Sequence, residues 1–251
     1  MDLAEKVAFV TGGSGDIGAG IAKALAAAGA DVAVSFVGHR EGASSTAEVV
    51  RAVGRRSAIV HLDQRDPQSI ESSVELVMGA LGRVDILVNN AGWNIGIPFT
   101  DLEALTLDVW NRVHETNLRG PYLLSRAFAP QLRAHGAGRI VNIASVGGLR
   151  PSSSSIAYSA SKAGLIHLTR CLAVALAPTV TVNCVAPGLV EGTRLAKRLP
   201  EAVADGARRQ AVLGRTASID DIADQVVAFC RADSVTGQCL VVDGGMPGGM
   251  H

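Results

Sequence analysis

Short apolar runs of the kind that form buried strands alternate with helix-like stretches along the whole chain. Most of these runs are rich in β-branched residues and apolar on both faces, as in strands of a parallel sheet. They lie at residues 6–11, 31–36, 57–62, 84–90, 138–145, 179–187 and 238–245. Helical patterns such as residues 17–29 lie between them, with Gly29 as a suitable C-terminal stop. This alternation predicts a doubly wound parallel α/β sheet of about seven strands, with helices on both faces.

Length and charge restrict the class of protein further. The 251 residues suit one large domain over residues 1–251 better than two small ones. Lys and Arg together number 23, as do Asp and Glu, which argues against nucleic acid or an anionic membrane as a partner. No run approaches the roughly 18–20 apolar residues of a membrane span, and a signal-peptide pattern is missing. We therefore expect a soluble cytoplasmic protein.

The cysteines and histidines give no sign of a metal site. His114 and Glu115 begin an HETNL stretch, but no second histidine follows at the spacing of a zinc motif. The cysteines lack CxxC spacing and lie in apolar segments, so we expect buried, reduced thiols at Cys171, Cys184, Cys230 and Cys239.

A glycine-rich stretch, TGGSGDIG at residues 11–18, connects the first predicted strand to the first predicted helix. Gly13, Gly15 and Gly18 fit G-x-G-x-x-G, whose glycines let the backbone turn sharply and approach a pyrophosphate at the helix N-terminus. Asp16 is suited to cap the N–H groups at the helix start, although its charge would repel a pyrophosphate by about 1 kcal/mol. The stretch predicts a dinucleotide site. The alternative is a glycine-rich turn without a ligand.

Tyr158 and Lys162 are four residues apart at the start of a helical pattern, so their side chains share a face. A neighbouring ammonium favours phenolate, so we expect Lys162 to lower the pKa of Tyr158 from about 10. Such a phenol exchanges a proton with a carbonyl or alcohol oxygen while hydride moves. Ser145 ends a predicted strand and is placed to hold the same oxygen. The alternative is a half-buried tyrosine beside a solvated lysine.

Together with NNAG at 89–92 and PG at 187–188, these motifs resemble the short-chain dehydrogenase/reductase family in order and spacing, over nearly the whole chain. The resemblance implies one Rossmann-type domain, a nicotinamide cofactor and a catalytic set of Ser145, Tyr158, Lys162 and Asn117. Asn117 would help to hold a proton-relay water beside Lys162. The family's motif T-G-x-x-x-G-x-G has a glycine where this chain has Asp16.

The second predicted strand ends in SFVGHR, without a carboxylate before Glu41. An acidic residue there would bind the ribose hydroxyls of NAD and disfavour a 2′-phosphate. Ser35 can donate a hydrogen bond, and His39 or Arg40 can meet a phosphate dianion, so NADP(H) is favoured over NAD(H). Gly15 points the other way, because NADP-using relatives often carry a basic residue there.

Other positions match family residues that contact the cofactor. Asp63 matches one that contacts adenine, Asn90 one that steadies the cleft, and the Val190 backbone one that meets the carboxamide. Thr193 follows Pro187 by six residues, where the family usually has five. The expected cofactor-binding residues are Gly12, Ser14, Gly15, Asp16, Ile17, Gly18, Ser35, His39, Arg40, Asp63, Asn90, Ala91, Gly92, Tyr158, Lys162, Pro187, Gly188, Val190 and Thr193.

Residues 189–215 match the variable lid that closes over the substrate in the family. Their cations are consistent with an anionic or carrier-bound substrate, and equally with solvated helix faces. They are Arg194, Lys197, Arg198, Arg208 and Arg209. Trp93 is a candidate for an apolar substrate wall, or for packing under the lid. The resemblance also implies a homotetramer, with segments near 106–134 and 157–176 at the shared interface.

The favoured function is NADP(H)-dependent reduction of a ketone or 3-oxoacyl thioester to a secondary alcohol, with Tyr158 as general acid/base, as in the similar 3-oxoacyl-carrier-protein reductases. One alternative is an NAD-dependent dehydrogenase of a polyol, sugar or cyclic alcohol, which would use the same site. Another is a non-catalytic dinucleotide sensor, a class that commonly lacks the Tyr–Lys pair. An enoyl reductase is disfavoured, because that branch spaces its Tyr and Lys more widely.

Overall fold

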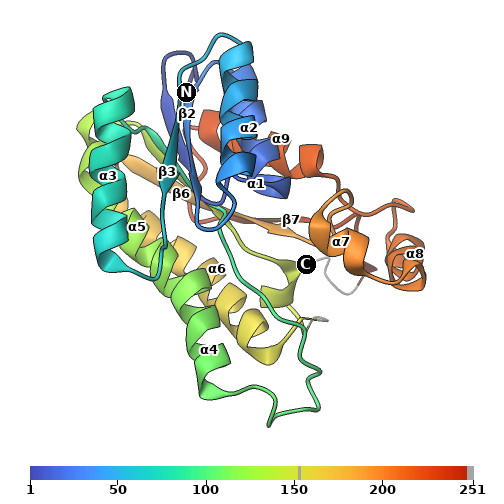
Figure 1. Ribbon diagram of the computed structural model, residues 1–251. Coiled ribbons are helices and arrows are strands. Elements are labelled where there is room, and N and C mark those ends of the chain that lie inside the picture. The colour runs from blue at the N-terminus through green and yellow to red at the C-terminus, as the bar shows by residue number, and fades with distance from the viewer. Residues whose placement is uncertain (152–153, 248–251) are drawn as a thin grey trace.

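The seven predicted strands form one parallel sheet in the order β3-β2-β1-β4-β5-β6-β7 (Figure 1). The computed structural model describes residues 1–151 and 154–247. The strands are Val7–Val10 (β1), Asp31–Phe36 (β2), Ser57–His61 (β3), Ile86–Asn89 (β4), Gly138–Ile143 (β5), Val180–Pro187 (β6) and Cys239–Val242 (β7). The predicted doubly wound α/β fold is confirmed.

Helices cover both faces of the sheet (Figure 1). One layer consists of α1 (Asp16–Ala27), α2 (Arg40–Ala52) and α9 (Ile219–Arg231). The other consists of α3 (Pro67–Leu81), α5 (Gly120–Ala134) and α6 (Ile156–Leu176). A π-helical turn, Glu115–Arg119, joins α4 (Leu107–His114) to α5. Two short helices, α7 (Arg194–Arg198) and α8 (Glu201–Gln210), stand apart from these layers (Figure 1).

The strands are apolar throughout because each face of the sheet is covered. In β1, Ala8 and Val10 belong to the core under α1, α2 and α9. Val7 and Phe9 belong to the core under α3, α5 and α6. Successive side chains of a strand point to opposite faces, so a strand with helices on both sides needs apolar residues at every position.

The position of the site follows from the strand order. β1 and β4 are neighbours, but the chain leaves β1 for α1 on one face and leaves β4 for α4 and α5 on the other. A crevice forms outside the carboxyl ends of two strands whose connections diverge in this way, and ligands of doubly wound sheets bind there. The glycine-rich stretch and the NNAG motif are the two segments that leave this point.

The cysteines of the chain are not all buried. Cys184 and Cys230 are buried and Cys239 is partly buried, but Cys171 is exposed, so the expectation of a buried thiol is wrong at Cys171. Cys171 lies on the face of α6 that the sheet does not cover. Within residues 1–151 and 154–247, no helix combines the length and apolar character that crossing a membrane requires.

Phe128 of α5 is fully buried and its ring centroid lies 5.2 Å from that of Phe9. We expect Phe128→Ala to lower the free energy of unfolding by about 3–5 kcal/mol, because it removes apolar contacts and leaves a cavity. Leu76→Ala on α3, where the side chain is 54% exposed, is the control and should change it by less than about 1 kcal/mol. Urea unfolding followed by circular dichroism measures both, and equal losses would contradict the assigned core.

Candidate active site

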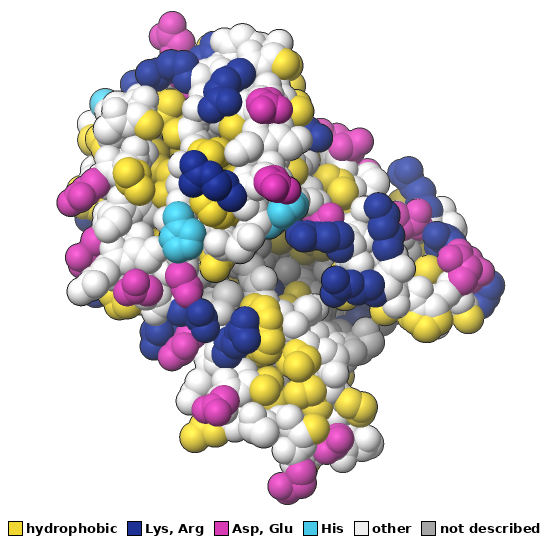
Figure 2. All heavy atoms as spheres, in the orientation of Figure 1, with side chains coloured by type: hydrophobic (Ala, Val, Ile, Leu, Met, Phe, Trp, Pro, Cys, Tyr) yellow, Lys and Arg dark blue, Asp and Glu magenta, His cyan; other side chains and the backbone are white. Residues whose placement is uncertain are grey.

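A cleft of about 550 Å³ opens at the carboxyl ends of the central strands. Nearly all the predicted site residues line it, although they come from loops far apart in the sequence. Of that set, Arg40, Asp63 and Asn117 do not line the cleft. Figure 2 shows the surface hollowed at this place, with Lys and Arg side chains on the side where α7 lies.

The glycines of the loop after β1 are required by its close packing. A Cβ on Gly18 would lie 2.3 Å from the carbonyl oxygen of Gly12, and a Cβ on Gly13 would lie 2.6 Å from Cβ of Val34. Gly12 has a φ of 65°, which favours glycine. The loop therefore brings bare backbone to the start of the 12-residue helix α1, an arrangement suited to a phosphate group.

Hydrogen bonds tie this loop to the segment after β4. The Thr11 hydroxyl accepts from the backbone N–H groups of Asn90 (3.0 Å) and Ala91 (2.9 Å). In return, Nδ2 of Asn90 donates to the carbonyl oxygen of Thr11 at 2.8 Å. These hydrogen bonds hold the two walls of the cleft together, and the cofactor contact predicted for Asn90 remains a prediction.

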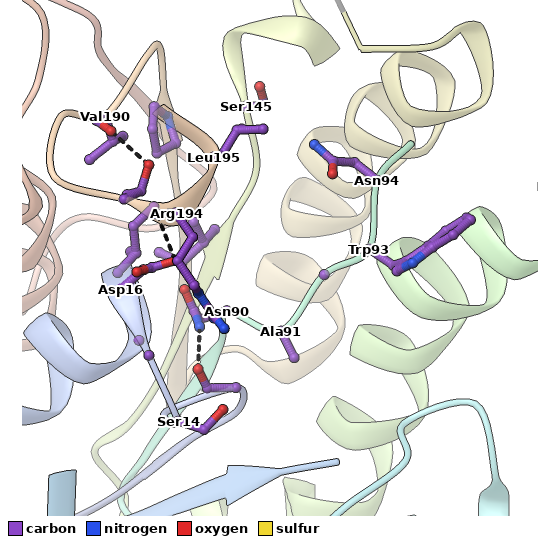
Figure 3. Close-up of a pocket in the computed structure, with 18 of the residues that line it drawn as sticks. Ser14, Asp16, Asn90, Ala91, Trp93, Asn94, Ser145, Val190, Arg194 and Leu195 are labelled. Carbon is purple, nitrogen blue, oxygen red and sulfur yellow. Dashed lines mark hydrogen bonds and ion pairs between the residues drawn. The ribbon is translucent and has the colours of Figure 1, made fainter. Parts of the chain in front are cut away.

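Asp16 has a partner that the local sequence did not indicate. The N-cap of α1 is Gly15, and no side chain caps this helix, so the expected capping role of Asp16 is wrong. Its carboxylate instead accepts hydrogen bonds from Arg194, from Nε at 3.0 Å and from the backbone N–H at 3.2 Å (Figure 3). The two residues are 178 positions apart, so no sequence pattern pointed to the pair.

The Ser–Tyr–Lys residues meet at one side of the cleft. Ser145 follows β5 and begins a 3-10 turn, where its Oγ accepts from the N–H of Gly147 at 3.0 Å. Tyr158 and Lys162 lie on the first turns of α6, with the Lys162 ammonium 5.7 Å from the centre of the Tyr158 ring. That ammonium donates to the carbonyl oxygen of Ile143 at 2.8 Å.

The pKa directions at this site differ from the sequence expectation. Burial raises the pKa of Tyr158, and a hydrogen bond with Ser145 only partly opposes the effect. The expected lowering by Lys162 is therefore wrong for this structure, since the ammonium turns toward Ile143 and the phenol loses its solvent. Burial also lowers the pKa of Lys162 to about 8, because a desolvated ammonium is disfavoured.

Asn117 does not line the cleft but holds the segment after β4 that carries Trp93. It lies in the π-helical turn and is fully buried. Its side chain accepts from the N–H of Trp93 and donates to the carbonyl oxygen of Trp93, each at 2.8 Å. A Cβ on Gly92 would lie 3.4 Å from Oδ1 of Asn117 and 3.6 Å from Nζ of Lys162, so both side chains approach that glycine.

The sequence predicted a 2′-phosphate site at the end of β2, but Ser35 and Arg40 make other contacts in the structure. Ser35 is buried, and its Oγ accepts from the N–H of Gly12 at 3.1 Å, so it holds the loop in place. His39 lines the cleft, with Nδ1 3.1 Å from the carbonyl oxygen of Ser14. Arg40 lies outside the lining, with its guanidinium 5.6 Å from the ring centre of Phe36.

Asp63 also lies outside the lining, because its carboxylate is engaged elsewhere. Arg65 forms a forked pair with it, at 3.0 Å from Nε and 2.7 Å from Nη2. The same guanidinium holds the pKa of Asp63 below its usual value. The contact with adenine that the resemblance implied remains a prediction.

The segment after β6 reaches over the cleft. Val190 forms a bridge with Ala217, which anchors the start of this segment. The Thr193 hydroxyl donates to the carbonyl oxygen of Val190 at 2.8 Å and accepts from the N–H of Ala196 at 3.1 Å, so it caps α7. This capping commits the hydroxyl of Thr193, although the residue lines the cleft as predicted.

Trp93 points away from Asn90 and Asp16, toward α4 (Figure 3). The guanidinium of Arg112 on α4 lies 4.3 Å from the Trp93 ring centre. Trp93 therefore lines the outer part of the cleft next to a cation. Among residues 1–151 and 154–247, no group of three His, Cys, Asp or Glu side chains is placed to hold a metal ion.

Comparisons with known proteins find similar sequences and structures over nearly the whole chain. The family model described as Enoyl-(Acyl carrier protein) reductase matches residues 13–247. The 3-oxoacyl-(acyl-carrier-protein) reductase of Escherichia coli strain K12 is 38% identical over 253 residues, covering 98% of this chain and 99% of the relative. The cis-4-hydroxycyclohexanecarboxylate dehydrogenase of Sinomonas cyclohexanicum is 37% identical over 247 residues, covering 97% of each.

A solved structure is equally similar. A blue fluorescent protein from a metagenomic library, solved in complex with NADPH, superposes with a TM-score of 0.90. It is 36% identical and covers 98% of this chain and 100% of that chain. The match extends over the phosphate loop, the α6 residues and the segment after β6.

The lowered pKa of Lys162 makes stability depend on pH. The unfolded chain binds this proton up to a pH of about 10.5, but the folded chain releases it above about 8. Stability relative to Lys162→Met should therefore rise with pH between about 8 and 9.5, by up to about 1.4 kcal/mol per pH unit. Urea unfolding at several pH values measures this difference. Lys197→Met, at an exposed position, is the control, and a flat difference for Lys162→Met would contradict the burial of the ammonium.

Proposed function

The chain belongs to the short-chain dehydrogenase/reductase family and is an NAD(P)-dependent oxidoreductase, and on that premise we propose that it reduces a ketone or 3-oxoacyl thioester to a secondary alcohol with NADPH. One observation carries the proposal. Ser145, Tyr158 and Lys162 converge on the same cleft as the glycine-rich loop, so a proton donor lies within reach of a bound dinucleotide.

The described residues fit a dinucleotide. In the loop after β1, a Cβ on Gly13 or Gly18 would collide with neighbouring atoms, and the loop leads into the N-terminus of α1. Ser14 and Gly15 would hold the phosphates, since the N–H of Gly12 already donates to Ser35. Tyr158 and Lys162 would lie beside the nicotinamide end. When bound, the nicotinamide supplies a hydride to the carbonyl carbon.

Tyr158 serves as the general acid. The phenol is protonated at neutral pH and donates this proton to the carbonyl oxygen, although the burial that raises its pKa makes it a weaker acid. The Ser145 hydroxyl donates a hydrogen bond to the same oxygen and stabilises its developing negative charge. Lys162, with a pKa of about 8, is close enough to neutrality to return a proton toward the phenol.

Asn117 is a positioning residue. It does not line the cleft, but it holds both backbone polar groups of Trp93 and approaches Gly92. It thereby fixes the wall opposite Lys162. The proton-relay water that the resemblance assigns to this residue remains part of the proposal.

An anionic, carrier-bound substrate is favoured over a small neutral one. Arg112 lies against the ring of Trp93, which lines the cleft. Lys and Arg side chains also flank the hollow beside α7 (Figure 2). A 3-oxoacyl thioester on a phosphorylated carrier arm would meet these cations. The similarity to the Escherichia coli 3-oxoacyl reductase supports this substrate class.

A second candidate is oxidation of a cyclic or polyol alcohol with NAD. The similarity to cis-4-hydroxycyclohexanecarboxylate dehydrogenase favours it, and the Ser–Tyr–Lys site serves either direction of hydride transfer. The use of Ser35 to hold the loop also weakens the case for a dedicated 2′-phosphate site. Enoyl reduction, named in the description of the family model, is disfavoured by the four-residue spacing of Tyr158 and Lys162.

We also infer a homotetramer, as the family resemblance implies. A largely apolar groove of about 600 Å³ runs along α4, α5 and α6, and includes Leu118, Tyr122 and Leu168. Leu107 nearby is 72% exposed. A second copy of the chain on this face would remove that apolar surface from water.

Tyr158→Phe tests the chemistry. Turnover of a 3-oxoacyl thioester should fall by about 10²–10⁴-fold, because the variant cannot donate a proton, while the NADPH dissociation constant should stay within about twofold. Tyr122→Phe is a matched control, since Tyr122 is the other tyrosine of the chain and lies outside the cleft. Full turnover by Tyr158→Phe would remove Tyr158 from the reaction.

Fluorescence titration with NADPH and with NADH tests the choice of cofactor. We expect NADPH to bind about tenfold more tightly, and His39→Ala to weaken NADPH by about three- to tenfold through loss of a contact with the 2′-phosphate. NADH serves as the internal control, because it has no such phosphate and should be unaffected. Tighter binding of NADH would instead favour the alcohol dehydrogenase.

A further inference from the structure

We propose that Arg194 is the counter-ion that allows a phosphate loop carrying Asp16 to bind the diphosphate of a dinucleotide. The proposal rests on the proposed dinucleotide-binding function and assigns a role to two residues that it does not otherwise explain. The family motif has a glycine at the position of Asp16. This chain therefore carries a negatively charged side chain next to the expected site of the negatively charged diphosphate.

The backbone shows that Asp16 replaces a glycine directly. Its φ is 47°, in the left-handed region that glycine adopts freely and that aspartate and asparagine tolerate better than other residues. It is also the first residue of α1, where the helix N-terminus attracts anions. An unpaired carboxylate held there would occupy the electrostatic site that a phosphate needs.

Arg194 neutralises this carboxylate from above the loop. Besides the bonds from its Nε and backbone N–H, its guanidinium extends over Gly15, where a Cβ would lie 2.9 Å from Nη2. The side chain thus covers the loop at the residues that line the cleft (Figure 3). With the ion pair formed, the negative charge of Asp16 is balanced, so the loop no longer repels a phosphate.

The segment that follows β6 positions the side chain of Arg194. Arg194 is the first residue of α7, and the Thr193 cap fixes where that helix begins. Another cation of the segment, Arg208, is occupied by Glu191, Glu201 and Asp205. The affinity of the loop for a dinucleotide is therefore coupled to the position of residues 189–198, even though these residues are remote from the loop in sequence.

A double-mutant cycle on NADPH binding tests the pairing. Arg194→Met should weaken binding about tenfold, because it exposes the Asp16 charge to the phosphates. Asp16→Asn should change binding by less than about threefold, and the double variant should return to within about threefold of the wild type. Lys197→Met, which removes a neighbouring cation of α7 that does not contact Asp16, is the matched control and should leave binding within about twofold.

The outcomes separate this proposal from the proposed function. If Arg194→Met weakens NADPH binding equally in the wild-type protein and in the Asp16→Asn variant, Arg194 acts on the phosphate directly and the counter-ion role is wrong. If Arg194→Met has no effect, Arg194 has no role in binding. If the wild-type protein binds neither NADPH nor NADH, the proposed function itself fails, whatever the variants do.

Hydrogen–deuterium exchange on the nucleotide-free protein examines the ion pair without any ligand. Asp16→Asn should speed amide exchange in residues 193–197 by about two- to fivefold, the range expected for a partly exposed pair. Lys197→Met should leave exchange across residues 11–18 unchanged. Unchanged exchange in Asp16→Asn would show that the carboxylate does not hold this segment and would overturn the coupling.

Discussion

The close approach of two loops at the carboxyl ends of β1 and β4 is the constraint on which the site depends. Thr11 and Asn90 join these loops by reciprocal hydrogen bonds, and Gly18 packs against the Gly12 carbonyl with no room for a Cβ. Because the two strands feed helices on opposite faces of the sheet, the loops diverge beyond this junction and leave a cleft between them. The phosphate loop and the segment carrying Gly92 are its walls, so a change at the junction would move both together.

Charge within the cleft is controlled by burial and by distant partners. The Lys162 ammonium and the Tyr158 phenol share a desolvated site, and burial shifts both pKa values toward the neutral forms. At the other end of the cleft, the Asp16 carboxylate is balanced by Arg194 rather than by burial, because it remains partly exposed. The charges at the two ends of the cleft are therefore controlled by different effects, burial at one end and an ion pair at the other.

Several residues of the predicted site hold the loops and helices around the cleft in place, in addition to or instead of contacting a ligand. Ser35 holds the phosphate loop, Asn117 holds the backbone of Trp93, and Thr193 caps α7. Each is a polar side chain at the edge of a buried sheet, where backbone groups without partners are costly and hydrogen bonds are needed whether or not a ligand is bound. Motif matching places such residues in or next to the cleft but does not separate those that support its walls from those that would touch a ligand.

The sequence by itself determined the seven strands, their parallel arrangement and the loops that form the cleft. It did so because apolar runs with helices between them, glycines after the first strand and the Tyr158–Lys162 spacing are local patterns with few structural solutions. The tertiary structure alone decided which charges meet. The Asp16–Arg194 pair, the turn of Lys162 toward Ile143 and the engagement of Asp63 by Arg65 depend on distances across the folded chain, or on side-chain directions set by packing. The direction of the Tyr158 pKa shift also depended on the tertiary structure. The sequence placed Lys162 near Tyr158 and so predicted a lowered pKa, but burial of the phenol, which is a property of the whole fold, raises it.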